Sequence, residues 1–316
     1  GAFHTETLYE FLIVLAPDTL SVDELLSFQR AFSSPPPLSS PPQPLLLDLS
    51  CSWRGRERGV VLSAAGAVLT AAAGVPVLLR GHARAALRTR LTLPMLLKRM
   101  GVALNLAPDD AAAQIKDCGL AFLDYSRMRD LPAAVLGVRF EIASETFFDV
   151  IEQCWNPFAA SAHVGGYRDQ EVAAQCGRLS AAMTRPGRRM LLAGNTDGAE
   201  EIRPGKSRIV ELRNDQVLPY EFDSMQAGVG PSHAELHCRG LTAELMAAEN
   251  IARMEALFTG RDRGGLRQSV FLNTALQLYA ARAVASWPEG MELAEETLDS
   301  GAGWTRFRQW LAWRPD

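Results

Sequence analysis

The sequence predicts an α/β protein, in which strands and helices alternate along the chain. The clearest evidence is the segment of residues 45–90, which reads as an apolar strand, an arginine-bearing turn, a helix of small residues, a second strand and a second arginine-rich loop. Apolar runs of strand length continue to alternate with helical stretches over the rest of the 316 residues, without an internal repeat. Because α/β proteins bind ligands at strand ends, the two arginine-rich loops are candidate ligand-binding loops.

Two amphipathic helices are predicted at the start of the chain. The first covers residues 5–15, and the second opens at residues 18–21, where Ser21 and Glu24 have the spacing of a capping box. The segment of residues 33–44, SSPPPLSSPPQP, fits neither a helix nor a central strand. We interpret it as a stiff linker, with a PxxP ligand motif as the alternative. The predicted organisation is a helical domain (1–32), a linker (33–44) and an α/β domain (45–316).

The α/β domain carries the remaining predicted elements. Strands are expected at residues 45–47, 74–79, 119–123, 162–167 and 188–193, and a hairpin at 207–212 and 216–222. Helices are expected at residues 62–73, 109–117, 132–150, 170–184, 242–258, 266–287, 291–299 and 304–313, with a further helix end at 95–101.

The composition is that of an ordinary soluble globular protein, with 47% hydrophobic and 22% charged residues. No apolar run approaches the about 20 residues of a membrane span, and the opening GAFHTETLYEF lacks the basic start of a signal peptide. The five cysteines are scattered and form no CxxC pair. This pattern indicates reduced thiols in a cytoplasmic protein rather than a disulfide or zinc framework.

Positive charge is concentrated in residues 51–99. This segment holds nine lysine and arginine residues and one acid, so its net charge is +8 in a chain whose net charge is −4. A sequence pI near 5.8 argues against a protein that coats nucleic acid along its whole surface, but it is compatible with a local basic patch.

Four segments carry a resemblance to a known family. They are LDLSCSWRGRERGVVLSAAGAVLTAAAGVPVLLRGH, VRFEIASETFFDVIEQCWNPF with its terminal Asn156–Pro157 pair, GNTDGAEEI, and the C-terminal stretch that begins VFLNTALQLYAARAVA. Together they resemble anthranilate phosphoribosyltransferase and the wider glycosyltransferase family 3, which includes pyrimidine nucleoside phosphorylases. The resemblance implies a small helical domain, here lacking about its first helix, joined by hinges to a large α/β domain with a mixed central sheet. It also implies a homodimer paired through the helical domain.

The resemblance implies a ligand site but also shows departures from the family pattern. Family enzymes cradle the diphosphate of phosphoribosyl pyrophosphate with a glycine-rich loop, because glycines let backbone N–H groups approach phosphate closely. Residues 51–56 match that loop here, and most of the glycines are gone. By position and charge, the implied phosphate-binding and substrate-binding residues are Arg54, Arg56, Arg58, Ser63, Arg80, Gly81, His82, Arg84 and Arg139. Glu200 and Glu201 match the acidic pair that holds magnesium in the family, and a solvated acidic loop is the alternative.

Two classes of function follow from these residues. The first is pentosyl transfer from a phosphorylated ribose donor; the standard anthranilate reaction is not expected, because several phosphate donors are lost. Arginines could replace them, since a guanidinium binds phosphate bidentately. The second is a non-catalytic nucleic-acid-binding protein that uses the basic segment of residues 51–99. The alternative to this second class is that the arginines pair with the excess acids elsewhere in the chain. A third interpretation is a structural or regulatory paralogue without a ligand at this site.

Overall fold

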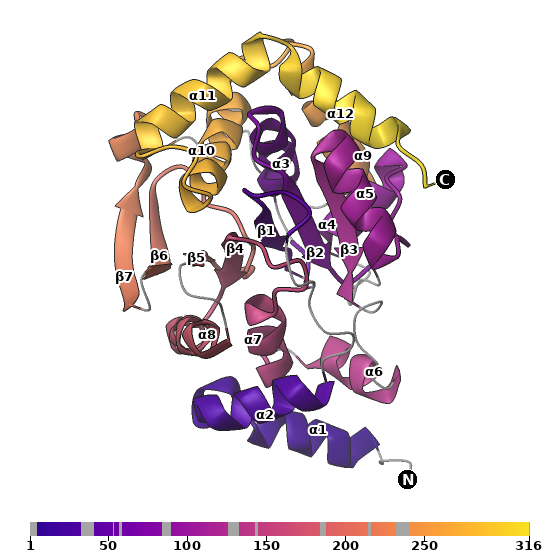
Figure 1. Ribbon diagram of the computed structural model, residues 1–316, viewed down its shortest axis with the longest axis vertical. Helices are drawn as coiled ribbons and strands as arrows, with labels where there is room; N and C mark the ends of the chain where they lie inside the picture. Colours follow the sequence, from indigo (N-terminus) through magenta and orange to yellow (C-terminus); the bar gives the residue numbers. More distant parts are fainter. Residues whose placement is uncertain are drawn as a thin grey trace.

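A seven-stranded mixed sheet forms the centre of the computed structural model (Figure 1). The structure describes residues 5–32, 41–52, 54–56, 59–83, 90–125, 133–142, 145–183, 188–213, 216–231 and 241–315. The strands are β1 (Leu47–Ser50), β2 (Val77–Gly81), β3 (Leu120–Asp124), β4 (Ala162–Tyr167), β5 (Arg189–Gly194), β6 (Lys206–Arg213) and β7 (Gln216–Asp223). Their order is β3-β2-β1-β4-β5-β6-β7, with the first five parallel and the last two antiparallel to their neighbours. The predicted α/β class with a mixed sheet is confirmed.

One face of the sheet packs against two helices from the first third of the chain and four C-terminal helices. These are α3 (Leu62–Ala72), α4 (Leu93–Met100), α9 (Ala243–Phe258), α10 (Gly265–Ala280), α11 (Trp287–Asp299) and α12 (Ala302–Ala312). Alternate residues of the strands, such as Leu47, Leu49, Val77 and Leu79, join these helices in one apolar core, because successive side chains of a strand point to opposite faces.

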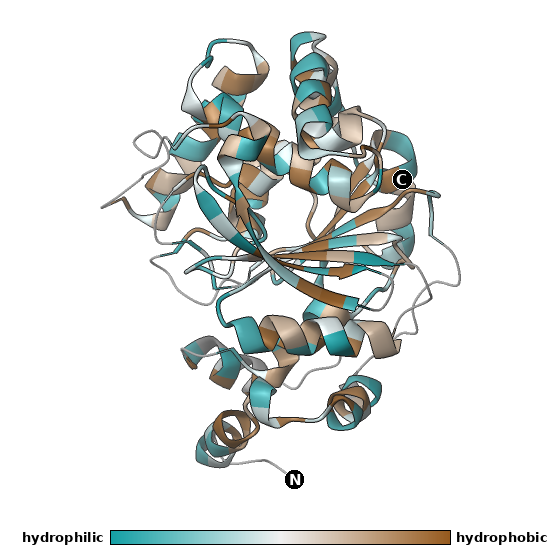
Figure 2. Cartoon of the chain, turned by 90° about the vertical axis from the view of Figure 1, so that its left-hand side faces the viewer, coloured by the Kyte–Doolittle hydropathy of each residue, from teal (hydrophilic) through white to brown (hydrophobic). Residues whose placement is uncertain are grey.

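The opposite face carries a second helical layer. It contains α6 (Ala133–Glu141), α7 (Phe147–Cys154) and α8 (Gln170–Met183), and beyond them α1 (Thr5–Val14), η1 (Pro17–Thr19) and α2 (Val22–Phe32) (Figures 1 and 2). The Phe28 ring of α2 stacks on the Phe147 ring of α7, with 4.6 Å between ring centroids. The N-terminal helices therefore pack on helices from the middle of the chain, and the helical part is not built from residues 1–32 alone.

A third apolar cluster covers the same face near β3. It joins α5 (Pro108–Cys118) to the segment after α7, where Trp155 and Phe158 are buried. Asn156 closes the turn between these two residues, because its side chain donates to the Ala160 carbonyl and accepts from the Ala160 N–H. Among the described residues, no helix is long and apolar enough to cross a membrane.

Most predicted elements are present, but several limits differ: the helix expected at 291–299 begins at Trp287, and the strand expected at 45–47 covers Leu47–Ser50. The helix expected at 266–287 ends at Ala280, since Arg282 takes a left-handed φ of 60° and Ser286 then caps α11. The helix expected at 132–150 is two helices, because Thr146 and Asp149 form a capping box that starts α7 anew. The hairpin is present as β6 and β7, and its expected turn residues 214–215 lie outside the described part.

Candidate functional site

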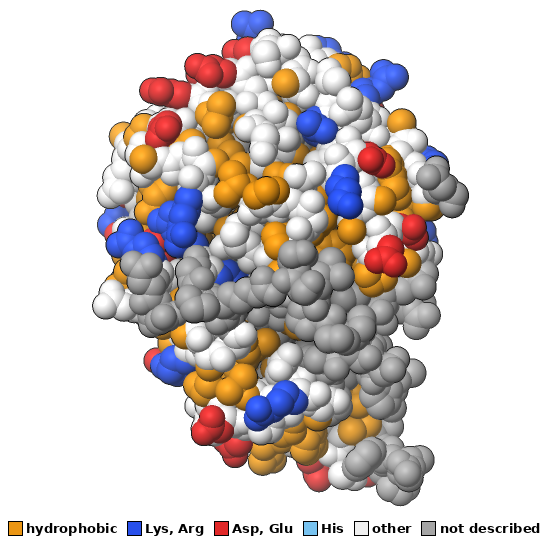
Figure 3. All heavy atoms as spheres, in the orientation of Figure 1, with side chains coloured by type: hydrophobic (Ala, Val, Ile, Leu, Met, Phe, Trp, Pro, Cys, Tyr) orange, Lys and Arg blue, Asp and Glu red, His pale blue; other side chains and the backbone are white. Residues whose placement is uncertain are grey.

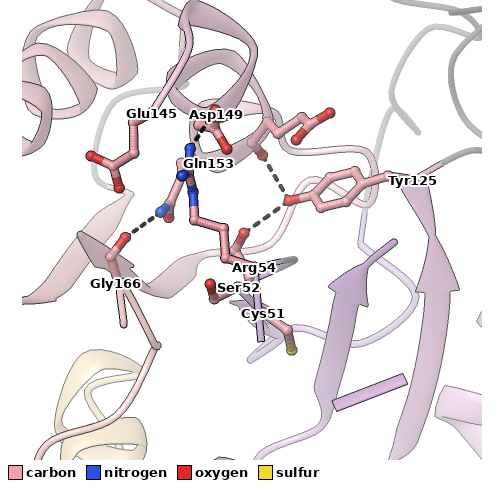
Figure 4. A pocket seen from close by; sticks show the side chains of 11 residues that line it. Cys51, Ser52, Arg54, Tyr125, Glu145, Asp149, Gln153 and Gly166 are labelled. Carbon is pink, nitrogen blue, oxygen red and sulfur yellow. Dashed lines mark hydrogen bonds and ion pairs between the residues drawn. The ribbon is translucent and has the colours of Figure 1, made fainter. Parts of the chain in front are cut away.

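The candidate site lies where the carboxyl ends of the parallel strands meet. The chain runs from β1 to β2 and β3 on one side and returns through β4 and β5 on the other, so the switch point lies between β1 and β4. A cavity of about 30 Å³ opens there, lined by residues that follow β1, by Gly166 of β4, and by α7 side chains such as Asp149 and Gln153 (Figure 4). This volume suits about two water molecules.

The loop after β1 turns inward at Gly55. This residue has a φ of +69°, a conformation that favours glycine. A side chain there would also lie 3.0 Å from each of Arg90, Leu91 and Thr92. The turn directs Arg56 toward the interior, and two backbone hydrogen bonds with Leu91, of 2.8 and 3.0 Å, fix the position. Arg56 is 0% exposed.

The loop after β5 brings two carboxylates to the same place. The Asn195 side chain organises this loop, since it accepts from the Asp197 and Ala199 N–H groups and donates to the Ala199 and Glu201 carbonyls. The loop lies directly on Gly166, where an added side-chain carbon would be 2.1 Å from the Ala199 oxygen. Glu200 and Glu201 consequently point inward, and both are buried.

The guanidinium of Arg56 lies between the two carboxylates. Its Nε is 3.1 Å from Glu201 Oε1, and its Nη2 is 3.0 Å from Glu201 Oε2 and 3.1 Å from Glu200 Oε1. Burial acts against ionisation of these groups, but the carboxylates still raise the pKa of Arg56 above its ordinary value. The pKa of Glu200 is lowered, because Arg56 and the Ser63 hydroxyl outweigh the effect of burial.

The start of α3 closes the same cluster. The backbone N–H groups of Leu62 and Ser63 donate to Glu201 Oε2 over 2.9 and 3.2 Å, and the Ser63 hydroxyl donates to Glu200 Oε1 over 2.6 Å. A helix N-terminus is a favourable place for an anion. Here the anion is a carboxylate of the chain itself.

The residues present do not fit a divalent metal ion at the acidic pair. Every carboxylate oxygen of Glu200 and Glu201 already accepts a hydrogen bond. Besides the bonds from Arg56 and α3, the Ser52 N–H donates to Glu200 Oε2 and Arg203 donates to Glu201 Oε1. A guanidinium occupies the space between the two carboxylates. Within the described ranges, no group of three or more His, Cys, Asp or Glu side chains could hold a metal.

A second buried ionic cluster centres on Asp48 of β1. Its carboxylate accepts two hydrogen bonds from Arg80 of β2 and one of 2.9 Å from Arg188, and it lies 3.0 Å from His163 Nδ1. Burial acts to raise the pKa of Asp48, but Arg80 and His163 hold it well below its ordinary value. Burial lowers the pKa of His163 to about 4, so this histidine is neutral near pH 7.

A third ion pair joins α6 to α7. Arg139 donates to both carboxylate oxygens of Glu152, over 2.7 and 3.0 Å, and His82 Nε2 lies 3.2 Å from the same carboxylate. Arg54 lines the small cavity with its guanidinium 4.0 Å from Asp149 (Figure 4). Asp149 is also 3.5 Å from Arg139, so α7 carries the acids that face these arginines.

The structure brings some predicted site residues together and separates others. Arg56, Ser63, Glu200 and Glu201 form one cluster, whereas Arg80, His82 and Arg139 belong to the pairs around Asp48 and Glu152. Gly81 ends β2, where a side-chain carbon would make an ordinary 3.5 Å contact with Cys51. Arg58 and Arg84 lie outside the described residues.

Three of the arginines on which the nucleic-acid hypothesis depends are buried, among those of residues 51–90 that the structure describes. Arg54, Arg56 and Arg80 are 6%, 0% and 0% exposed. All three pair with acids, as the alternative to that hypothesis expects. The partner of Arg80, Asp48, and the partner of Arg139, Glu152, were not predicted from the sequence, and neither was His163 beside Asp48. A charged residue inside an apolar strand, as Asp48 is, was the signal that could have revealed the first of them.

The geometry defines the class of this protein. A mixed sheet with its site at the switch point, a helix that starts just after β1, and an acidic loop after β5 are the features of a phosphoribosyltransferase-like fold. Residues 54–304 match the model of the glycosyl transferase family, a/b domain. The chain therefore belongs to this glycosyl transferase family.

Curated relatives and solved structures agree with this assignment. The chain is 27% identical over 301 residues to anthranilate phosphoribosyltransferase of Methanosarcina mazei, covering 95% of this chain and 78% of the relative. It is 30% identical over 296 residues to the enzyme of the same name from Brevibacillus brevis, covering 92% and 83%. A crystal structure of anthranilate phosphoribosyltransferase from Thermus thermophilus superposes with a TM-score of 0.75 at 26% identity, covering 99% and 96%. The enzyme from Saccharomyces cerevisiae in complex with PRPP and Mg shares the fold, with a TM-score of 0.72 at 16% identity over 92% and 78% of the two chains.

Proposed function

We propose that this chain is a family member that does not transfer a phosphoribosyl group to anthranilate in the standard way. Any turnover belongs to pentosyl transfer from a phosphorylated ribose donor, with a changed donor or acceptor. The exposed apolar side chains Phe11, Ile13 and Val14 of α1 support the further proposal of a homodimer paired through the N-terminal helices.

The observation that carries the proposal is the filled site at the switch point. This cavity measures about 30 Å³, far below the roughly 300–1,000 Å³ of a small-molecule pocket, and a wider cavity of about 860 Å³, lined by Arg168 and Thr196, shares only Glu145 with it. Arg56 and Arg80 stand at positions that, by the family resemblance, are expected to contact phosphate. Both instead form ion pairs with buried carboxylates. Loss of one oxyanion donor typically slows an enzyme about 10²–10³-fold. With several lost, we expect anthranilate transfer at least about 10⁴-fold below that of a standard enzyme.

Two measurements test the proposal. The first is isothermal titration calorimetry with millimolar phosphoribosyl pyrophosphate and magnesium, for which we expect no heat of specific binding. The second follows loss of anthranilate fluorescence, with an active anthranilate phosphoribosyltransferase measured in parallel as the positive control. Turnover within 100-fold of that control, abolished by Glu200→Gln, would overturn the proposal. Release of phosphate or diphosphate from other phosphorylated riboses identifies a changed donor.

A further inference from the structure

The Arg56 cluster balances its charges with groups of the chain itself, and in the described part of the structure one buried donor, Arg56 Nη1, has no hydrogen-bond partner. Glu200 and Glu201 contribute two negative charges, and all four of their oxygens are hydrogen-bonded within the protein. Arg56 supplies one positive charge at the centre, and Arg203, 28% exposed, supplies another at the rim, 3.1 Å from Glu201 Oε1. Together the two arginines carry the charge of a divalent cation. A buried carboxylate pair needs such compensation, because unpaired buried charges are costly.

Neighbouring backbone and side-chain contacts fix the position of Arg56. Its backbone is pinned to Leu91 by two hydrogen bonds, and the left-handed Gly55 precedes it. The planar guanidinium meets Glu201 with two nitrogens, which is the bidentate geometry that arginine, but not lysine, can form. A metal ion could approach the carboxylates only if this side chain left.

We infer that Arg56 is a covalently attached replacement for a divalent cation, and that it keeps Glu200 and Glu201 from binding one. The replacement also ties together three segments: the loop after β1, the start of α3 and the loop after β5. Glu201 also occupies the N-terminus of α3, where an external anion could otherwise bind. The side chains of the cluster therefore fill both a cation site and an anion site.

Metal binding to the purified full chain tests this inference without any substrate. Mn²⁺ is titrated and its free fraction is followed by electron paramagnetic resonance. We expect the wild-type protein to show no specific site at millimolar Mn²⁺. Arg56→Ala and Arg56→Gln should each gain one site with an affinity at least tenfold higher, and adding Glu200→Gln should remove it. Arg56→Lys keeps the positive charge and should stay without a site.

Control variants and a second readout separate metal binding from unfolding. Arg253→Ala removes an arginine from the surface pair with Glu249 and should leave Mn²⁺ binding unchanged. The melting temperature of Arg56→Ala should rise with millimolar Mg²⁺, whereas that of the wild type should not. If the Arg56 variants fold only when metal is present, that result also supports the inference. If they fail to fold with and without metal, the inference is contradicted, because a divalent cation then does not replace the guanidinium.

Three results would overturn the inference. One is a stoichiometric Mn²⁺ site in the wild type that Glu200→Gln abolishes. Another is a folded Arg56→Gln variant without any gain in affinity. The third is failure of the Arg56 variants to fold both with and without millimolar divalent metal. None of these results bears on the proposed loss of anthranilate transfer, which is measured with substrates and product.

Discussion

Glu145 lies in the wall of the small cavity with its Oε2 atom buried and without a hydrogen-bond partner. Its other oxygen accepts only a long 3.4 Å hydrogen bond from the Arg168 N–H. Burial, with a further contribution from the neighbouring Asp149, raises the pKa of this carboxyl to about 7. The contrast with Glu200 is instructive. Arg54 and Arg168 act to lower the pKa of Glu145 but do not outweigh its burial, whereas Arg56 and Ser63 outweigh the burial of Glu200, so the two pKa values move in opposite directions.

The raised pKa of Glu145 makes the folded protein less stable as pH rises. The unfolded carboxyl, with an ordinary value near 4.5, loses its proton first, so stability falls between about pH 4.5 and pH 7. Glu145→Gln resembles the protonated form and removes this dependence. We expect the variant to be more stable than the wild type by about 1–2 kcal/mol at pH 8 and by little at pH 4.5, measured by urea unfolding. Glu10→Gln, at an exposed site on α1, is the control, and an equal gain at both pH values would contradict the assignment.

Arg56 shows which features of the site can be predicted from the sequence and which cannot. The charge of residue 56 and its place in a loop after a strand were readable, as was the acidic pair. Their pairing was not, because 145 residues separate Arg56 from Glu201 and only the fold brings them together. An arginine in a polar turn is usually solvated, and burial here depends on the inward turn at Gly55.

At the level of elements, the contact between β4 and the loop after β5 positions the acidic pair. Gly166 has the backbone of Ala199 directly against it, and Gly198 enters the loop with a left-handed φ of 65°. The strand limits of β4 were predicted to the residue, since HVGGY lies between clear breaks. The close approach was not predicted, because a pair of glycines in a strand signals a bulge and a close neighbour equally well.

Gly166→Ala tests the importance of this contact. The added methyl group would overlap the Ala199 carbonyl, and both partners are backbone, so the strand or the loop must move. We expect a loss of about 2–3 kcal/mol in the free energy of unfolding. Gly137→Ala in α6 has no atom within 4 Å of the new carbon and is the matched control. It should be neutral or stabilise by up to about 1 kcal/mol. Equal effects of the two substitutions would refute the role of the close approach.

At the level of the whole molecule, the position of positive charge decides between the two functional classes. The +8 segment suggested a basic surface, but three of its arginines are interior. Lys98 and Arg99, near the end of α4, are exposed. On the face shown in Figure 3, Lys and Arg side chains stand in small separate groups with acidic and apolar side chains between them. Net charge per segment is a sequence property, whereas a binding surface requires that the charges point outward together.

Single-stranded DNA binding should therefore be weak and only slightly salt-dependent. Each phosphate contact contributes about −0.7 to the slope of log affinity against log salt for single strands. Lys98 and Arg99, the exposed cations among the described residues of 51–99, give a slope near −1.4, whereas the seven arginines of residues 51–90 acting together would give about −5. Fluorescence anisotropy from about 50 to 200 mM salt measures the slope. A value near −5, reduced by Arg54→Ala, would restore the nucleic-acid hypothesis.

The Arg56 cluster also changes how this fold depends on its surroundings. A magnesium ion is in exchange with solution, so its occupancy follows the supply of free ion and a chelator can strip it. A guanidinium on the polypeptide has a fixed local concentration and a fixed coordination geometry. The corner of the protein between α3 and the loop after β5 thus keeps its charge balance when divalent ions are scarce. In return, it cannot be tuned by exchanging one ion for another.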